Sequence, residues 1–145
     1  MYSALDVAKY IVSYCNSCGY SMSNLKLQKI LYFVQAYFLM QPSSTPCFRE
    51  NIEAWDFGPV VHEVYSEFKQ FGSTDIPRVY SDNFENNVIQ EKDKKLINDV
   101  IEKFKNYSAS DLVRITHNQA PWQDAYSRYG NVVIPNSAIR GYFNE

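Results

Sequence analysis

The cysteines are the first residues whose spacing could support chemistry. Cys15 and Cys18 are separated by two residues, a spacing typical of redox-active and metal-binding motifs. Only Cys47 could supply a third thiolate, and no nearby histidine completes a set of four ligands. We therefore predict no metal site, with Cys15 in the core and Cys18 incidental. Three cysteines cannot pair fully, so we expect the thiols to be reduced.

His62 and Glu63 begin a stretch that matches the first half of the HExxH zinc helix. In that motif a second histidine, one helical turn later, lets two imidazoles reach one metal from the same face. Here the corresponding position is Ser66. The sequence therefore does not predict a zinc site at this helix.

His117 is the remaining candidate for chemistry, because histidine titrates near neutral pH and a carboxylate such as Asp56 or Glu63 could orient it. It ends a predicted helix and is followed closely by Pro121 and Trp122. This order suits a tight turn, in which the imidazole bonds a carbonyl or side chain and the indole packs over it. We predict a structural role for His117, with partner contact and catalysis as the alternatives. The sequence contains no Gly-rich phosphate loop and no nucleophile elbow.

Composition predicts one mainly helical domain. The chain has 145 residues, enough to bury roughly two thirds of its unfolded surface. Aromatic residues make up 16%, whereas Gly (5) and Pro (6) are few, which favours helices over short strands. A net charge of −2 argues against a nucleic-acid partner, which normally needs a basic stripe. Since the first residues lack a basic segment and an apolar core, we expect a cytoplasmic protein without a membrane partner.

Residues 24–41 predict the centre of the fold. Apolar side chains cover most of the circumference of this predicted helix, which is typical of a helix buried in a core. The apolar run is too short for a bilayer, which needs about 20 such residues. The residues that recur at helical spacing are Leu27, Ile30, Leu31, Val34 and Phe38.

The other elements are expected to surround this helix. Alternation over residues 52–57 predicts a short strand or hairpin, stopped by Gly58. Pro59 is expected in the first turn of the next helix, because its missing amide hydrogen would have no partner there. Residues 73–90 suggest a surface loop with a short strand. Periodic stretches predict further helices, giving a mainly α, compact bundle of about five to six helices. These helices run from Ser3 to about Ser17, from Pro59 to about Gly72, from Glu91 through Phe104 and from Ser108 to about His117.

Three of these stretches together resemble one family. Residues 25–33 read LKLQKILYF, against the family pattern LKLQKLLYF. Residues 53–68 match EAW.YGPVVPEVY.EF except that Phe57 replaces a tyrosine and His62 replaces a proline. Residues 116–143 follow the order TH, PW, G, IP and YF. On these motifs the chain is identified as a member of the Panacea domain family, the SocA-like antitoxins of phage-associated proteins. The motif positions to which the resemblance gives a structural role are Leu27, Gln28, Gly58, Pro59, Val60, His117, Pro121 and Trp122.

The resemblance implies an antitoxin, encoded beside a toxin on phage or other mobile DNA, that neutralises the toxin by direct binding. It covers Leu5 to Phe143, so residues 1–145 are expected to form a single Panacea domain. Members can also act as adaptors that deliver a toxin to a bacterial ATP-dependent protease. The expected protein is not an enzyme and needs no cofactor. The alternatives are a small hydrolase-like enzyme using His117 and a transcriptional autoregulator, which the acidic balance disfavours.

Aromatic anchors supply most of the energy in protein interfaces, so we expect an aromatic-lined surface to bind the toxin. Tyrosines off the core faces, such as Tyr126 and Tyr129, are further candidates. The predicted contacts are Trp55, Asp56 and Phe57 in the turn after the strand, and Lys26 and Lys29 at the polar start of the central helix. Tyr80, in the predicted loop of residues 73–90, is the last of them.

Overall fold

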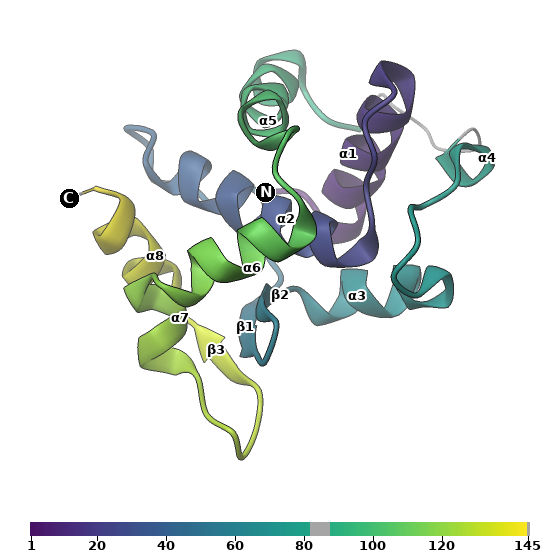
Figure 1. The fold of residues 1–145 in the computed structure, drawn as a ribbon. Coiled ribbons are helices and arrows are strands. Elements are labelled where there is room, and N and C mark those ends of the chain that lie inside the picture. The colour runs from purple at the N-terminus through teal and green to yellow at the C-terminus, as the bar shows by residue number, and fades with distance from the viewer. Residues whose placement is uncertain (82–87, 145) are drawn as a thin grey trace.

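The computed structural model describes residues 1–81 and 88–144 (Figure 1). The architecture is mainly helical with a small antiparallel sheet, as the sequence predicted. The elements are α1 (Ala4–Cys18), α2 (Asn24–Leu39), β1 (Ile52–Trp55), β2 (Gly58–Val60), α3 (His62–Phe68), η1 (Lys69–Phe71), α4 (Arg78–Ser81), α5 (Glu91–Phe104), α6 (Ala109–His117), α7 (Ala120–Ala125), β3 (Val132–Ile134) and α8 (Asn136–Phe143).

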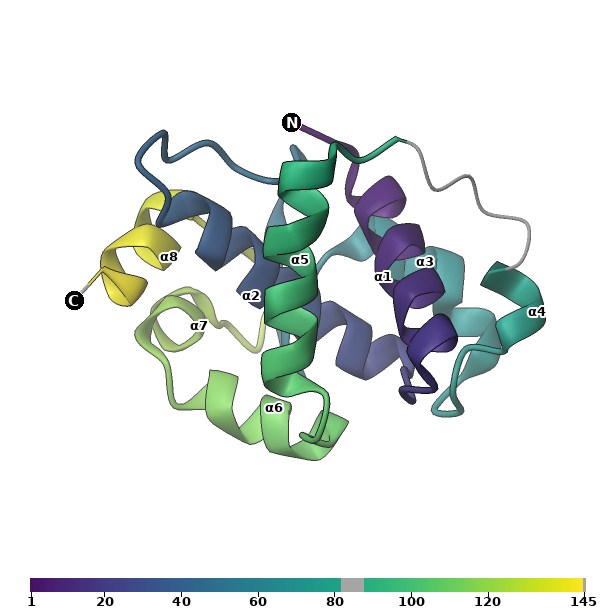
Figure 2. The ribbon, with the colours of Figure 1, turned by 90° about the horizontal axis from the view of Figure 1, so that it is seen from above.

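Helix α2 is the predicted central helix, and it ends at Leu39. It contacts α1, α3, α5, α6, α8 and β2, so the rest of the chain is arranged around it (Figures 1 and 2). Even its polar side chains are buried, and each has a partner. Gln35, for example, is fully buried, and its amide oxygen accepts from Cys47 N at 2.8 Å and from Phe48 N at 3.2 Å. Burial therefore extends around the whole helix, as its composition indicated.

Helix ends follow the capping chemistry of the sequence. The Ser3 hydroxyl accepts from Asp6 N at the start of α1, and Gly19 ends that helix with a left-handed φ of 76°. Ser108 and Asp111 form a reciprocal capping box at the start of α6. Cys15 is buried and Cys18 exposed. The sequence located these boundaries to within about a residue.

Three predictions need correction. Pro59 does not begin a helix: it lies in β2 opposite Ala54, and α3 starts only at His62. The sequence analysis also missed β3, a strand of only three residues. Where a short strand was expected in residues 73–90, the chain forms the short helix α4. Residues 82–87 of that stretch lie outside the described residues.

The sheet has the order β2-β1-β3. β1 and β2 form a hairpin in which Trp55 lies opposite Gly58, so Asp56 and Phe57 are the two turn residues. β3 pairs antiparallel with the other edge of β1, joining Ile52 to Ile134. The sheet lies on the side of α2 opposite α5, with α6 and α7 beside it (Figure 1).

Within residues 1–81 and 88–144, no helix combines the length and apolar character required to cross a membrane. The same residues hold no group of three or more His, Cys, Asp or Glu side chains placed to bind a metal ion.

Candidate interaction site

The inner face of the β1–β2 hairpin rests on α2 and α6 at Gly58. This residue has a φ of 103°, and a Cβ placed there would lie 2.8 Å from Lys29 Cε and 2.9 Å from Thr116 Oγ1. The Thr116 hydroxyl donates to Leu112 O at 2.8 Å, which fixes its position on α6. Both the backbone angle and the close approach therefore require glycine at this position.

Lys29 holds β2 from inside the protein. Its side chain is fully buried, and Nζ donates to Pro59 O at 2.9 Å. Desolvation lowers the pKa of Lys29 to about 7. No carboxylate of the described residues forms an ion pair with it. Lys29 is thus a buried amine that supports the hairpin.

Burial overturns the expectation that Lys29 and Lys26 contact a partner. Lys26 is 7% exposed, and its Nζ donates to Lys105 O at 3.0 Å. Lys29 is enclosed by the protein, and Lys26 Nζ is bound by Lys105 O, so neither side chain is presented on an exposed surface.

Gln28 of α2 also supports the hairpin, at the residue that follows β2. Its amide oxygen accepts from Val61 N at 2.9 Å, and its amide nitrogen donates to Asn24 Oδ1 at 3.0 Å. Asn24 Nδ2 in turn donates to Tyr65 O at 3.1 Å. A chain of side-chain amides therefore ties α2 to the end of β2 and to α3.

A second set of side chains holds the turn from outside, and we call it the aromatic clamp: His117, Trp122 and Tyr126. His117 Nε2 donates to Asp56 O at 2.9 Å, and Trp122 Nε1 donates to Trp55 O at 2.8 Å. The Tyr126 hydroxyl donates to the Asp56 carboxylate. The rings stack, with centroids 4.1 Å apart for His117–Trp122 and 4.6 Å for Trp122–Tyr126.

This is the arrangement of imidazole, carbonyl and indole that the sequence suggested for a tight turn. His117 bonds a backbone carbonyl, while the Asp56 carboxylate accepts from Tyr126 instead. The Asp56 carboxylate therefore does not orient the His117 ring. Pro121 is buried in the first turn of α7, where it leads into Trp122.

Outside the clamp, several large apolar side chains are exposed. Phe57, at the tip of the hairpin, is 57% exposed, and Tyr129 is 85% exposed. Val132 and Val133 of β3 add exposed aliphatic groups. A cavity of about 350 Å³ lies between Trp55–Phe57 and residues 127–131. We call Phe57, Tyr129, Val132 and Val133 together the tip surface.

The structure brings only part of the predicted contact set to this surface. Trp55, Asp56 and Phe57 line its cavity. Tyr80 lies elsewhere: its ring packs on Phe68 and Phe71 beyond the end of α3, and its hydroxyl donates to Glu67. Sequence reasoning missed the two valines of β3. Their β-branched pair after Gly130 and Asn131 is a strand signal that could have identified them.

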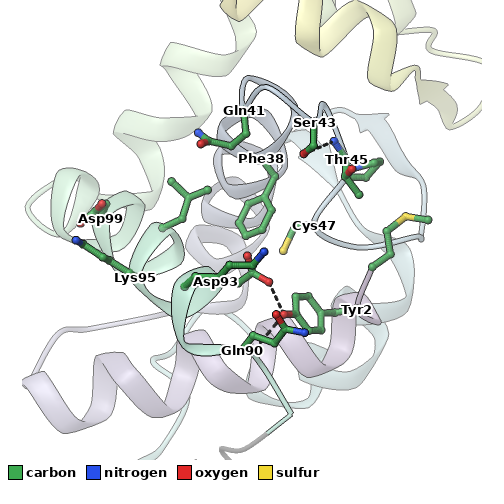
Figure 3. A pocket seen from close by; sticks show the side chains of 14 residues that line it. Tyr2, Phe38, Gln41, Ser43, Thr45, Cys47, Gln90, Asp93, Lys95 and Asp99 are labelled. Atoms are coloured by element: carbon green, nitrogen blue, oxygen red, sulfur yellow. Dashed lines mark hydrogen bonds between the residues drawn. The ribbon is translucent and has the colours of Figure 1, made fainter.

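A larger cavity, of about 780 Å³, lies between α5 and the segment after α2 (Figure 3). The Tyr2 hydroxyl donates there to Asp93 and accepts from Gln90 N. Cys47 lies at this cavity but is only 1% exposed, and burial raises the pKa of its thiol. Enclosure and the raised pKa both disfavour the thiolate, which is the nucleophilic form of cysteine.

The fold and site together define a small helical domain built to present a clamped hairpin. Comparison with known proteins places it in a family: the pattern of the antitoxin SocA-like Panacea domain matches residues 27–123. The chain belongs to this family, as its motifs predicted. Antitoxin SocA from Caulobacter vibrioides (strain NA1000 / CB15N) is 38% identical over 69 residues.

That alignment covers 48% of this chain and 36% of the relative, so the chain matches about a third of the length of the curated protein. No solved structure shows a significant match. The family match includes Lys29, Gly58, Thr116 and Trp122 but ends before Tyr126 and β3. The matched residues thus include most of the side chains that support the hairpin and also Phe57 of the tip surface.

Proposed function

We propose that this chain is the antitoxin of a toxin–antitoxin system and that it neutralises its toxin by binding it at the tip surface. Membership of the SocA-like antitoxin family supports the antitoxin role. The name of its relative, Antitoxin SocA, supports the same conclusion. We infer that residues 1–145 act as one Panacea domain in the cytoplasm and that the neutralisation requires no reaction.

The observation that carries the proposed surface is Phe57, a large apolar side chain 57% exposed on a turn that is held from both sides. Side chains bind the carbonyls of Trp55, Asp56 and Pro59, so the turn is fixed before a partner arrives. A preformed aromatic anchor loses little conformational entropy on binding. Such anchors, next to a pocket, typically dominate interface energy.

Co-expression tests the proposal. Bacteria express the reading frame adjacent to the gene for this chain, alone and together with the chain. We expect growth arrest by the neighbour alone, rescue by co-expression, and co-purification of the two proteins. A harmless neighbour, or rescue without a complex, would contradict neutralisation by contact.

The same assay separates simple binding from delivery to a protease. It is repeated in strains that lack ATP-dependent proteases, and the toxin level is measured by immunoblot. Neutralisation by binding predicts unchanged rescue and an unchanged toxin level. Rescue that disappears together with a protease would make the chain an adaptor instead.

A further inference from the structure

The site around Lys29 suits a neutral amine better than an ammonium group. The side chain is fully buried, and among the described residues the one hydrogen bond of Nζ goes to Pro59 O at 2.9 Å. An ammonium group has three N–H donors, so two of them find no acceptor there. The ion pairs of the described residues do not include Lys29. Because a buried charge without a partner is strongly unfavourable, the charged form opposes the closed site.

Strand β2 covers the amine from the hairpin side. A Cβ on Gly58 would lie 2.8 Å from Lys29 Cε and 3.4 Å from Nζ, so the strand closes directly over the amine. Two side chains of α2 bind this part of the chain: Lys29 at Pro59 O and Gln28 at Val61 N. β2 is at the edge of the sheet, with β1 as its only strand neighbour. The hairpin can therefore separate from α2, and admit water to Nζ, without breaking its own β1–β2 pairs.

The other ionisable groups of the elements packed around this site have partners of their own. They are His117 on Asp56 O, Asp56 on the Tyr126 hydroxyl, Glu53 on Trp55 Nε1, Lys26 on Lys105 O and Asp111 with Arg114. Lys29 is thus left without a counter-charge, and desolvation lowers its pKa to about 7.

We propose that Lys29 is a proton switch for the hairpin: a protonated amine favours release of β2 from α2, and a neutral amine keeps β2 seated. In the released form water reaches the amine, and its pKa returns toward the ordinary 10.5, against about 7 in the seated form. Between these values the released form binds one more proton, so a rise in pH shifts the equilibrium toward the seated hairpin.

The inference concerns the position of the hairpin, whatever the hairpin binds. One consequence rests on the proposed function: if the toxin binds the tip surface, its binding weakens as the pH falls toward 7, because fewer hairpins are then held in place. The switch would make the presentation of Phe57 sensitive to pH in the range just above neutrality.

Two backbone amides of the same kind allow the switch to be measured. Val61 N donates to Gln28 Oε1 at 2.9 Å across the contact between hairpin and α2. Cys47 N donates to Gln35 Oε1 at 2.8 Å at another point of α2. Each is a buried backbone amide bound by a glutamine of the central helix. Hydrogen exchange at Val61 therefore reports the seating of the hairpin, and Cys47 is the matched control.

The experiment is amide exchange of the purified chain, followed by NMR from about pH 7 to about pH 8.5 and corrected for the intrinsic rate at each pH. We expect Val61 to be less protected than Cys47 at the lower pH, and its protection to rise about tenfold across the range. Lys29→Met should abolish this rise, whereas Lys95→Met, at an exposed lysine, should retain it. His117→Gln leaves the amine in place and should also retain the rise.

Titration of the Lys29 side chain itself, by NMR of labelled lysine Cε, gives a second measurement that needs no variant. The signal should titrate near the lower end of the same range. An amine that stays charged throughout would overturn the proposal, as would a rise that survives Lys29→Met or disappears with His117→Gln. Equal protection of Val61 and Cys47, rising together, would mean that only unfolding of the whole chain exposes the amine. These measurements use the chain alone, so their failure leaves the antitoxin role standing.

Discussion

The β1–β2 hairpin has an inner face on α2 and α6 and an outer face that carries Phe57 and adjoins β3. On the inner face, side chains approach Gly58 so closely that a single added carbon would clash. The polar groups there have partners, from Lys29 Nζ on Pro59 O to Gln28 on Val61 N. Specificity at this face comes from shape and hydrogen bonding.

The outer face has the opposite character. Its aromatic and aliphatic groups are exposed, and a cavity lies between the hairpin and the loop before β3. The match to the family model spans residues 27–123, which include Phe57 and Trp122 but not this loop. The two faces therefore differ in role: close packing holds the hairpin on the inner face, and the outer face leaves large apolar side chains exposed.

The largest expected effect is at the inner face. Gly58→Ala adds a Cβ 2.8 Å from Lys29 Cε at a φ of 103°, so it should destabilise the fold by about 2–4 kcal/mol. Denaturant unfolding followed by circular dichroism measures this. Gly141→Ala is the control, because a Cβ there meets nothing within 4 Å. Equal stability of the two variants would mean that the hairpin can move away from α2.

The second effect is the pH dependence caused by Lys29. Its pKa is about 7 in the folded chain and 10.5 ordinarily, so between these values the unfolded chain binds one more proton. Stability therefore rises with pH above about 7, by up to about 1.4 kcal/mol per pH unit from this group. Lys29→Met should remove that rise.

The window for this measurement is about pH 7 to 8.5. Above it, the buried thiols act in the opposite direction: burial raises the pKa of Cys15 to about 12 from 9.0, so the unfolded chain releases this proton first. Urea unfolding is compared for the wild type, Lys29→Met and the exposed control Lys95→Met. A slope that Lys29→Met leaves unchanged would mean that the amine keeps its charge inside the fold.

Much of the scaffold could be predicted from the sequence because its signals are local. Apolar periodicity identified α2, and Ser3, Gly19 and Ser108 marked helix ends. Pro59 was wrongly predicted to lie in the first turn of a helix, because proline suits both that position and the edge of a sheet. The register with Ala54, which decided between them, depends on pairing across the turn rather than on the residue itself.

The candidate site could be predicted only in part. Trp55, Asp56 and Phe57 stand together in the sequence, so the turn was found. The lysines were misplaced because a polar residue at a helix start is usually exposed, whereas Lys29 lies beneath Gly58. Val132 and Val133 reach the hairpin from the far end of the chain, and that proximity depends on tertiary packing.

A smaller effect is expected at the aromatic clamp. Trp122→Phe keeps an aromatic ring between His117 and Tyr126 but removes the hydrogen bond to Trp55 O, at a cost of about 1 kcal/mol. The amides of the turn should exchange faster, and toxin affinity should fall because the turn is less fixed. Trp55→Phe is the control for stability, since its indole donates only to Glu53 in the same strand.

The smallest effect on stability, and the largest on binding, is expected at the tip. Phe57→Ala removes a side chain that is 57% exposed, so the free energy of unfolding should change by less than about 0.5 kcal/mol. Toxin binding, measured by calorimetry, should weaken at least about tenfold, as for an aromatic anchor. Tyr107→Ala removes an aromatic ring that is 40% exposed and packs on Phe104 at the end of α5, and should bind normally. If Phe57→Ala binds normally but Gly58→Ala does not, the hairpin supports the fold and the toxin is bound by another surface.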